Sequence, residues 1–272
     1  MDLNTISAFA RPRRRDELAF EPGDAWLAGG TWLFSEPQPK LRRLIDLSGL
    51  GWPALEFSDA GVGIAATCTI AELAASVGRP EWQAWPLARQ CCLSLLGSFK
   101  IWNMATVGGN ICMALPAGPM TSLTSSLDGV ATLWTPDGGE RVLPVAEFVL
   151  GPQRTALKPG EILRQIDISA EALSRRYAFR RISLSAQGRS GALLVGTLGA
   201  DGAFVLSVTA STRRPVQIRC GGVPDAATLA GLLEAAIPDA LIYDDIHGAP
   251  DWRRHVTAHF AQQIRAELEA RA

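Results

Sequence analysis

The 272-residue sequence predicts an α+β fold of two domains, and three observations lead to this prediction. Short apolar runs bounded by glycine or proline alternate with stretches of helical periodicity, as in folds that mix strands and helices. Hydrophobic residues make up 47% of the chain and charged residues 19%, so we expect a substantial core. A break at residues 169–175 separates a domain of residues 1–169, in two parts (1–53 and 54–169), from a domain of residues 170–272.

The elements of the N-terminal domain follow from local signals. A short helix is expected at residues 15–20, and strands are expected at 26–28, 44–47, 62–66, 131–134, 141–145 and 162–168, the last closing the domain. Thr69, with Glu72 three residues later, predicts a capping box that opens a helix ending at Gly78. A second helix is expected at 87–96. The run Pro136-Asp137-Gly138-Gly139 predicts a hairpin between two of the strands.

The C-terminal domain reads as a small sheet with helices. Strands are expected at residues 177–182, 193–198, 203–209 and 216–218, with Asp201-Gly202 as a hairpin turn. Two helices follow the strands. In the last helix, apolar residues recur every four positions and form one stripe, which predicts that the helix packs on a core. The residues of this stripe are Trp252, Val256, Phe260, Ile264 and Leu268.

Composition excludes several classes of function. The formal net charge of −1 gives no field that attracts nucleic acid or anionic lipid, so neither is an expected partner. No apolar run approaches the roughly 18 residues of a membrane span. The N-terminal arginines lack the apolar segment of a signal peptide, so we expect a cytoplasmic protein. The cysteines fit neither a disulfide framework nor a metal cluster and are interpreted as buried free thiols: Cys68, Cys91, Cys92, Cys112 and Cys220.

Two glycine pairs carry the strongest functional signal. The first lies in Ala105-Thr106-Val107-Gly108-Gly109-Asn110-Ile111-Cys112, and the second in Trp26-Leu27-Ala28-Gly29-Gly30-Thr31-Trp32-Leu33. Adjacent glycines permit close approach, and a loop that offers backbone N–H groups and polar side chains can hold a diphosphate. Neither pair has the lysine of a P-loop or the spacing of a Rossmann motif. A single pair is more often a tight turn, whereas two suggest a ligand between two subdomains.

The two motifs together resemble the FAD-binding subunit of the molybdenum hydroxylases, the xanthine dehydrogenase and carbon monoxide dehydrogenase family. That family typically reads Ala-Gly-Gly-Thr-Asp-Leu, then Thr-Val-Gly-Gly-Asn-Ile, then Pro-Ala-Gly-Asp. The similarity extends to residues 64–73, to residues 154–163, to Pro116-Ala117-Gly118 and to a C-terminal domain of matching length. It implies a two-subdomain FAD-binding fold followed by a small α/β C-terminal domain.

The resemblance also implies a function and a set of site residues. FAD, held without a covalent bond, would accept electrons from an iron–sulfur subunit that a large molybdenum-cofactor subunit reduces, and would pass them to NAD or another acceptor. The clusters and the molybdenum cofactor would lie on those partners only, and no catalytic side chain is expected here because the flavin carries the redox chemistry. The implied FAD-binding residues are Leu27, Ala28, Gly29, Gly30, Thr31, Trp32, Thr106, Gly108, Gly109, Asn110, Met113, Gly118, Pro119, Leu157 and Arg180.

Four positions depart from the family pattern and keep alternatives open. Trp32 and Pro119 stand where the family has Asp, Met113 where it often has a small polar residue, and Arg180 where it has Lys. The loss of charged hydrogen bonds favours a scaffold or assembly subunit of the same fold with weakened FAD binding. A stand-alone flavin oxidase is a further alternative, which would act on a substrate without partner chains.

The histidines do not suggest a metal site or a flavin attachment point. His255 and His259 have helical i, i+4 spacing, but no metalloprotease glutamate lies between them and no third ligand is evident. We interpret them as solvated helix surface. His247 also lies in the C-terminal tail, far in sequence from both glycine pairs. The thiols of Cys68 and Cys112 remain formally possible for a covalent link to the flavin, which we do not expect.

Overall fold

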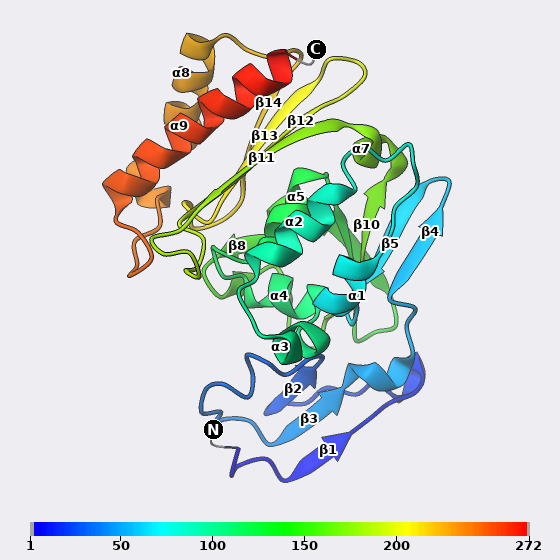
Figure 1. Cartoon of the computed structure of the whole chain (residues 1–272). Coiled ribbons are helices and arrows are strands. Elements are labelled where there is room, and N and C mark those ends of the chain that lie inside the picture. Colours follow the sequence, from blue (N-terminus) through cyan, green and yellow to red (C-terminus); the bar gives the residue numbers. More distant parts are fainter. Residues whose placement is uncertain (1–2, 271–272) are drawn as a thin grey trace.

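Three short parallel strands form an N-terminal sheet in the computed structural model, which describes residues 3–270 (Figure 1). In sheet order they are β1 (Ala8–Ala10), β3 (Arg43–Asp46) and β2 (Asp24–Leu27). The two predicted strands of this region are therefore confirmed within two residues. The expected helix at 15–20 is only a 3₁₀ turn, Arg15–Glu17. Because β2 ends at Leu27, the first glycine pair leaves directly from its carboxyl end.

A five-stranded antiparallel sheet forms the middle of the molecule. Its strands, in sheet order, are β4 (Leu55–Ser58), β5 (Gly61–Ala65), β10 (Ile162–Ser169), β6 (Val130–Trp134) and β7 (Glu140–Pro144). β6 and β7 form the predicted hairpin. β10 lies at the centre of the sheet and pairs with both β5 and β6. The strand that comes last in the sequence therefore joins the two halves of the sheet. A small pair, β8 (Val149–Gly151) with β9 (Arg154–Thr155), follows the hairpin.

Seven helices accompany this sheet in the described residues. They are α1 (Ile70–Ala75), α2 (Pro86–Ser94), α3 (Phe99–Met104), α4 (Val107–Met113), α5 (Pro119–Ser126), α6 (Val145–Phe148) and α7 (Ala170–Ser174). The predicted capping box is confirmed, since Thr69 Oγ1 accepts from the Glu72 N–H at 3.1 Å and Glu72 Oε2 accepts from the Thr69 N–H at 2.8 Å. Helices α3 to α7 were not predicted. No helix in the described residues is long and apolar enough to cross a membrane.

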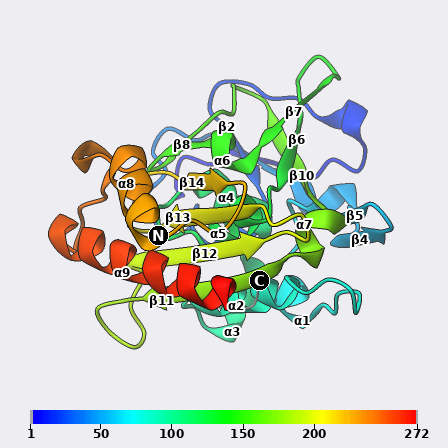
Figure 2. The ribbon, with the colours of Figure 1, turned by 90° about the horizontal axis from the view of Figure 1, so that it is seen from above.

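The C-terminal sheet is antiparallel, in the order β11-β12-β13-β14, and two helices cover its outer face (Figure 2). The strands are β11 (Arg176–Ile182), β12 (Ala192–Leu198), β13 (Phe204–Thr209) and β14 (Val216–Cys220), and the helices are α8 (Ala226–Ala236) and α9 (Pro250–Glu269). The predicted stripe of α9 faces the sheet, where Ile264 and Leu268 are fully buried. Gly196 lets α9 approach, because a Cβ there would lie 2.2 Å from Ile264 Cγ2.

Helix α5 lies between the two larger sheets and is buried along its whole length. It packs against β12 and β13 on the face of the C-terminal sheet opposite α9 (Figure 1). Its polar side chains bond locally: Thr124 donates to the Met120 carbonyl at 2.8 Å and Ser126 to the Ser122 carbonyl at 2.6 Å. The Ser122 hydroxyl also bonds the Thr209 hydroxyl of β13 at 2.7 Å. Of the five hydroxyl groups of α5, only that of Thr121 is buried without a partner in the described chain. Small side chains that bond mostly within the helix therefore allow an uncharged helix to fill the junction.

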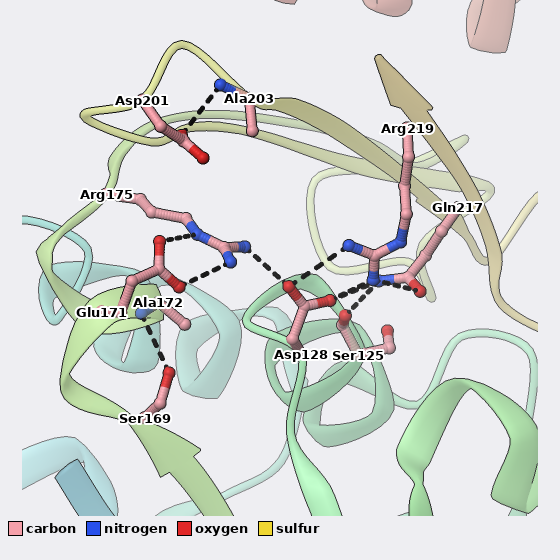
Figure 3. Close-up of polar contacts among 10 residues, drawn as sticks. All are labelled: Ser125, Asp128, Ser169, Glu171, Ala172, Arg175, Asp201, Ala203, Gln217 and Arg219. Atoms are coloured by element: carbon pink, nitrogen blue, oxygen red, sulfur yellow. Dashed lines mark hydrogen bonds and ion pairs between the residues drawn. The ribbon is translucent and has the colours of Figure 1, made fainter. Parts of the chain in front are cut away.

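An ionic network holds the carboxyl end of α5 to the C-terminal sheet (Figure 3). Asp128, just after α5, pairs with Arg175 at 2.7 Å and with Arg219 of β14. Gln217 of β14 donates to the Ser125 carbonyl at 2.6 Å. Burial alone would raise the pKa of the Asp128 carboxyl, but the paired guanidinium groups hold this pKa below its usual value. The charged form of Asp128 therefore stabilises the folded chain.

We expect Asp128→Asn to lower the free energy of unfolding by about 1.5–3 kcal/mol at pH 7, the typical value of hydrogen bonds to charged groups. Asn tolerates the left-handed backbone at this position, where φ is 52°. Because the folded-state pKa is depressed, this stabilisation is present above the unfolded-state pKa, about 4, and is lost as pH falls through the folded value.

Urea unfolding at neutral and acid pH measures the effect. The matched control is Asp201→Asn, since in the described residues Asp201 bonds only the N–H of Ala203, at 3.0 Å. If Asp128→Asn lowered the free energy of unfolding equally at both pH values, the charge of Asp128 would not be the source of the stabilisation.

Candidate functional site

A cavity of about 560 Å³ lies where the three sheets meet, and it is the candidate site. Its walls come from the segment after β2, from the chain between α2 and the start of α5, and from loops of the C-terminal sheet and of the segment before α9. The volume lies within the range of small-molecule sites, which are mostly apolar with few polar groups. The two glycine pairs, far apart in the sequence, both reach this cavity.

Most of the residues predicted to bind FAD line the cavity. These are Leu27, Ala28, Gly29, Gly30, Thr31, Trp32, Thr106, Gly109, Asn110, Met113, Gly118 and Pro119. The sequence therefore identified one cavity from two separate segments. The walls from the C-terminal half were missed, and these include Arg189, Tyr243, Asp245 and Arg253. No local motif marks them, because loops and the first turn of α9, far apart in that half of the chain, bring them together.

Three predicted residues lie outside the cavity lining, each for a physical reason. Gly108 packs against Ala66, the residue directly after β5, where a Cβ would lie 2.4 Å from the Ala66 Cβ. Leu157 packs on the core of the middle sheet. Arg180 pairs with Glu267 of α9 at 2.7 Å and donates to Gln263 of the same helix at 2.9 Å. The structure thus places Arg180 against α9 and outside the cavity lining, and its expected role near the flavin stays a prediction.

The first glycine pair leaves a row of backbone donors unused. Within residues 3–270, the N–H groups of residues 29–33 have no hydrogen-bond acceptor. Gly30 has a φ of 67°, which favours glycine, and Gly29 is pressed against α3, where a Cβ would lie 1.7 Å from the Met104 carbonyl oxygen. Unused backbone donors of this kind can bind an anion, and the expected role of the loop in holding a diphosphate stays a prediction.

The second glycine pair is different, because it forms the first turn of α4 instead of a loop. The Val107 N–H donates to the Cys68 carbonyl at 2.8 Å, and the Gly108 N–H donates to the Ala66 carbonyl at 2.9 Å. The Gly109 N–H donates to Thr106 Oγ1 at 3.0 Å. Each of these donors is already satisfied, so the expectation that this segment offers N–H groups to a diphosphate is corrected. It forms a close-packed wall instead.

Asn110 also has a partner inside the protein. Its Oδ1 accepts from the Met120 N–H at 3.0 Å, which satisfies a donor at the start of α5. Pro119 is the first residue of α5 and has no N–H to satisfy, so it suits this position. These two residues therefore fix α4 relative to α5 and shape the cavity wall.

The thiols near the site are poor nucleophiles. Burial raises the pKa of the Cys68 thiol to about 12, and it raises the pKa of the cavity-lining Cys112 thiol to about 12 as well. Since the thiolate is the reactive form, both remain protonated at neutral pH. This favours a ligand held without a covalent bond. All five cysteines are free.

The histidines of α9 are exposed, away from the cavity walls. His255 and His259 stack with ring centroids 6.4 Å apart, and His259 Nε2 lies 2.9 Å from Gln263 Nε2. In the described chain, no group of three or more His, Cys, Asp or Glu residues is placed to hold a metal ion.

Sequence comparisons place the N-terminal part in a known family. Residues 14–170 match the family described as the FAD binding domain in molybdopterin dehydrogenase. The chain is 30% identical over 97 residues to the carbon monoxide dehydrogenase medium chain of Afipia carboxidovorans, an alignment that covers 36% of this chain and 33% of that protein. It is 30% identical over 98 residues to the caffeine dehydrogenase subunit beta of Pseudomonas sp. CBB1, an alignment that covers 36% of this chain and 33% of that protein. The chain thus matches about a third of the length of these relatives.

Solved structures match over nearly the full length. Quinoline 2-oxidoreductase from Pseudomonas putida 86 superposes with a TM-score of 0.80 at 21% identity, covering 98% of both chains. Carbon monoxide dehydrogenase from Oligotropha carboxidovorans gives a TM-score of 0.79 at 21% identity, covering 97% of this chain and 98% of that one. At this identity the likeness is one of fold, and it confirms the predicted α+β fold.

Paired substitutions at the second glycine pair test which glycine faces the cavity. Gly108→Ala should lower the free energy of unfolding by about 1–3 kcal/mol, because its Cβ would meet the Ala66 backbone at 2.7 Å. Gly109→Ala should change stability by less than about 1 kcal/mol, since its Cβ would meet only the Thr106 hydroxyl, at 2.9 Å, and Ala favours helix. Urea unfolding measures both values.

An FAD titration of the same variants completes the test. Gly109→Ala should bind FAD at least about tenfold more weakly despite its intact fold, since the added methyl group enters the cavity. Equal stability losses in both variants, or unchanged FAD affinity in Gly109→Ala, would contradict the assignment.

Proposed function

The chain belongs to the family of FAD-binding domains of molybdopterin dehydrogenases, and on that premise we propose that it is the flavin-carrying electron-transfer subunit of a molybdenum hydroxylase complex. The observation that carries the proposal is the cavity. Two segments chosen from sequence, residues 27–32 and 106–119, line it together, and the unused N–H groups of residues 29–33 lie in one of its walls.

The residues present fit FAD. Unused backbone donors suit a diphosphate, and the apolar walls suit an aromatic ring system. Gly29 and Gly30 permit the loop geometry that exposes those donors. When bound, FAD supplies the acceptance and release of electrons. The protein holds and orients the flavin, and its walls restrict the access of water.

Partner subunits are part of the proposal. Segment 93–104 borders the cavity through Leu96 and Ile101, and it exposes large apolar side chains on its outer side. Phe99 is 72% exposed and Met104 is 54% exposed. Several exposed large apolar side chains within one segment are typical of a docking site. We propose that an iron–sulfur subunit covers it, with a large molybdenum-cofactor subunit as the source of electrons and NAD or another molecule as the acceptor.

A second candidate is a scaffold subunit that no longer binds FAD. Pro119, with no carboxylate, and the occupied donors of α4 favour it, because both remove contacts that a flavin would use. The row of unused donors after β2 favours the flavoprotein. A stand-alone flavin oxidase would need no exposed apolar segment for a partner. The expected cytoplasmic location stays a prediction.

Purification of the tagged chain from its own host tests the function. We expect an iron–sulfur chain and a molybdenum chain to copurify, and acid precipitation to release one FAD per chain into the supernatant. The isolated chain should dehydrogenate no organic substrate. Phe99→Asp should lose the partner chains and keep FAD, whereas Val142→Asp, at an exposed apolar residue on β7, should keep both.

The alternatives give different results in the same experiment. A colourless chain that binds no added FAD would support the scaffold. Turnover of a substrate by the isolated chain at enzymatic rates would support the stand-alone oxidase.

A further inference from the structure

Only three charged side chains line the cavity in the described chain: Arg189, Asp245 and Arg253. Arg253 is 1% exposed and pairs with Asp245. Its remaining donors go to backbone carbonyls, with Nε to Gly248 at 2.8 Å and Nη1 to Gly191 at 2.7 Å. This pair is neutral overall, and each nitrogen of the Arg253 guanidinium donates at least one hydrogen bond within the protein. Arg189 is therefore the cavity's one net charge among the described residues.

Arg189 differs from its neighbours in having no polar partner. It lies in the connection between β11 and β12, is exposed, and makes no hydrogen bond or ion pair with the part of the chain that the structure describes. The residues beside it are held in place: Arg181 donates to Ser190 Oγ at 2.8 Å and to the Gly188 carbonyl at 2.7 Å. The loop is thus braced on both sides of an arginine whose own donors are unused.

The Arg189 guanidinium lies over the first glycine loop. Its central carbon is 6.0 Å from the ring centroid of Trp32, which is a cation–π distance. Trp32 follows directly on residues 29–31, whose N–H groups have no acceptor within residues 3–270. The C-terminal half of the chain therefore brings a free cation to the same wall where the N-terminal half presents free backbone donors.

We propose that Arg189 binds the diphosphate of a dinucleotide, at the same wall of the cavity as the backbone donors of residues 29–33. The proposal rests on the proposed function, in which that dinucleotide is FAD. The planar guanidinium fork suits phosphate oxygens, and charge-assisted bonds of this kind are among the stronger ones. The contact with Trp32 keeps the Arg189 guanidinium over the loop and leaves the N–H groups of the guanidinium unused. Arg189 thereby supplies charge that backbone donors alone do not.

FAD titrations of the full chain by flavin fluorescence test this proposal. The variants are Arg189→Gln, Arg189→Lys and the control Arg154→Gln, which removes an exposed arginine of β9 outside the cavity lining. We expect Arg189→Gln to bind FAD about ten- to a hundredfold more weakly, as for the loss of one charged bond. The FAD affinity of Arg189→Lys should lie between those of the wild type and Arg189→Gln, and the affinity of the control should equal that of the wild type.

The dependence of FAD affinity on KCl concentration separates a phosphate contact from a ring contact. The loss of a cation–phosphate contact should make this dependence shallower in Arg189→Gln than in the wild type, because salt screens that attraction. Thermal unfolding checks that the variants fold. Wild-type affinity in Arg189→Gln, or weaker affinity with an unchanged salt dependence, would overturn the assignment. A wild-type chain that binds no FAD would overturn the proposed function and this inference with it.

Discussion

The fully buried helix α5 determines how the halves of this chain meet. Its eight residues have no charged side chain, and their hydroxyl groups bond mostly to the helix's own carbonyls, so the helix packs against the C-terminal sheet without stranding a charge. The carboxyl end of α5 is held by Asp128, which pairs with Arg175 and Arg219. The amino end of the helix reaches the cavity at Gly118 and Pro119. The cavity lies where it does because this helix holds the middle and C-terminal sheets together.

The N-terminal sheet completes the site through a backbone contact. Gly29 lies so close to the Met104 carbonyl that no side chain fits between them, and this fixes the first glycine loop beside α3 and α4. The two glycine pairs then do different work. The first glycine pair leaves backbone N–H groups available to a ligand, whereas Gly108 of the second pair allows α4 to pack closely at the end of β5. In the proposed electron-transfer subunit, the first pair binds the diphosphate and the second forms the wall of the site.

Local signals were enough to predict much of this arrangement. The Thr69–Glu72 capping box, the Asp201-Gly202 hairpin and the stripe of α9 all depend on neighbouring residues, and all are present. The helical state of α4 was missed because adjacent glycines disfavour helix, and tertiary contacts to β5 override that preference. Arg180 and Arg189 could not be told apart from sequence. Which of them faces α9 and which faces the cavity depends on a helix about 70 residues further along.

The most direct test of the account is amide hydrogen exchange with and without FAD, followed on peptides of the intact chain. Unpaired amides exchange quickly, whereas amides in stable hydrogen bonds are protected. The account predicts that residues 29–33 exchange quickly in the free chain and slow strongly when FAD binds. Amides 107–109 should already be protected and should change little. Protection that FAD induces at 107–109 while 29–33 stay unchanged would contradict it.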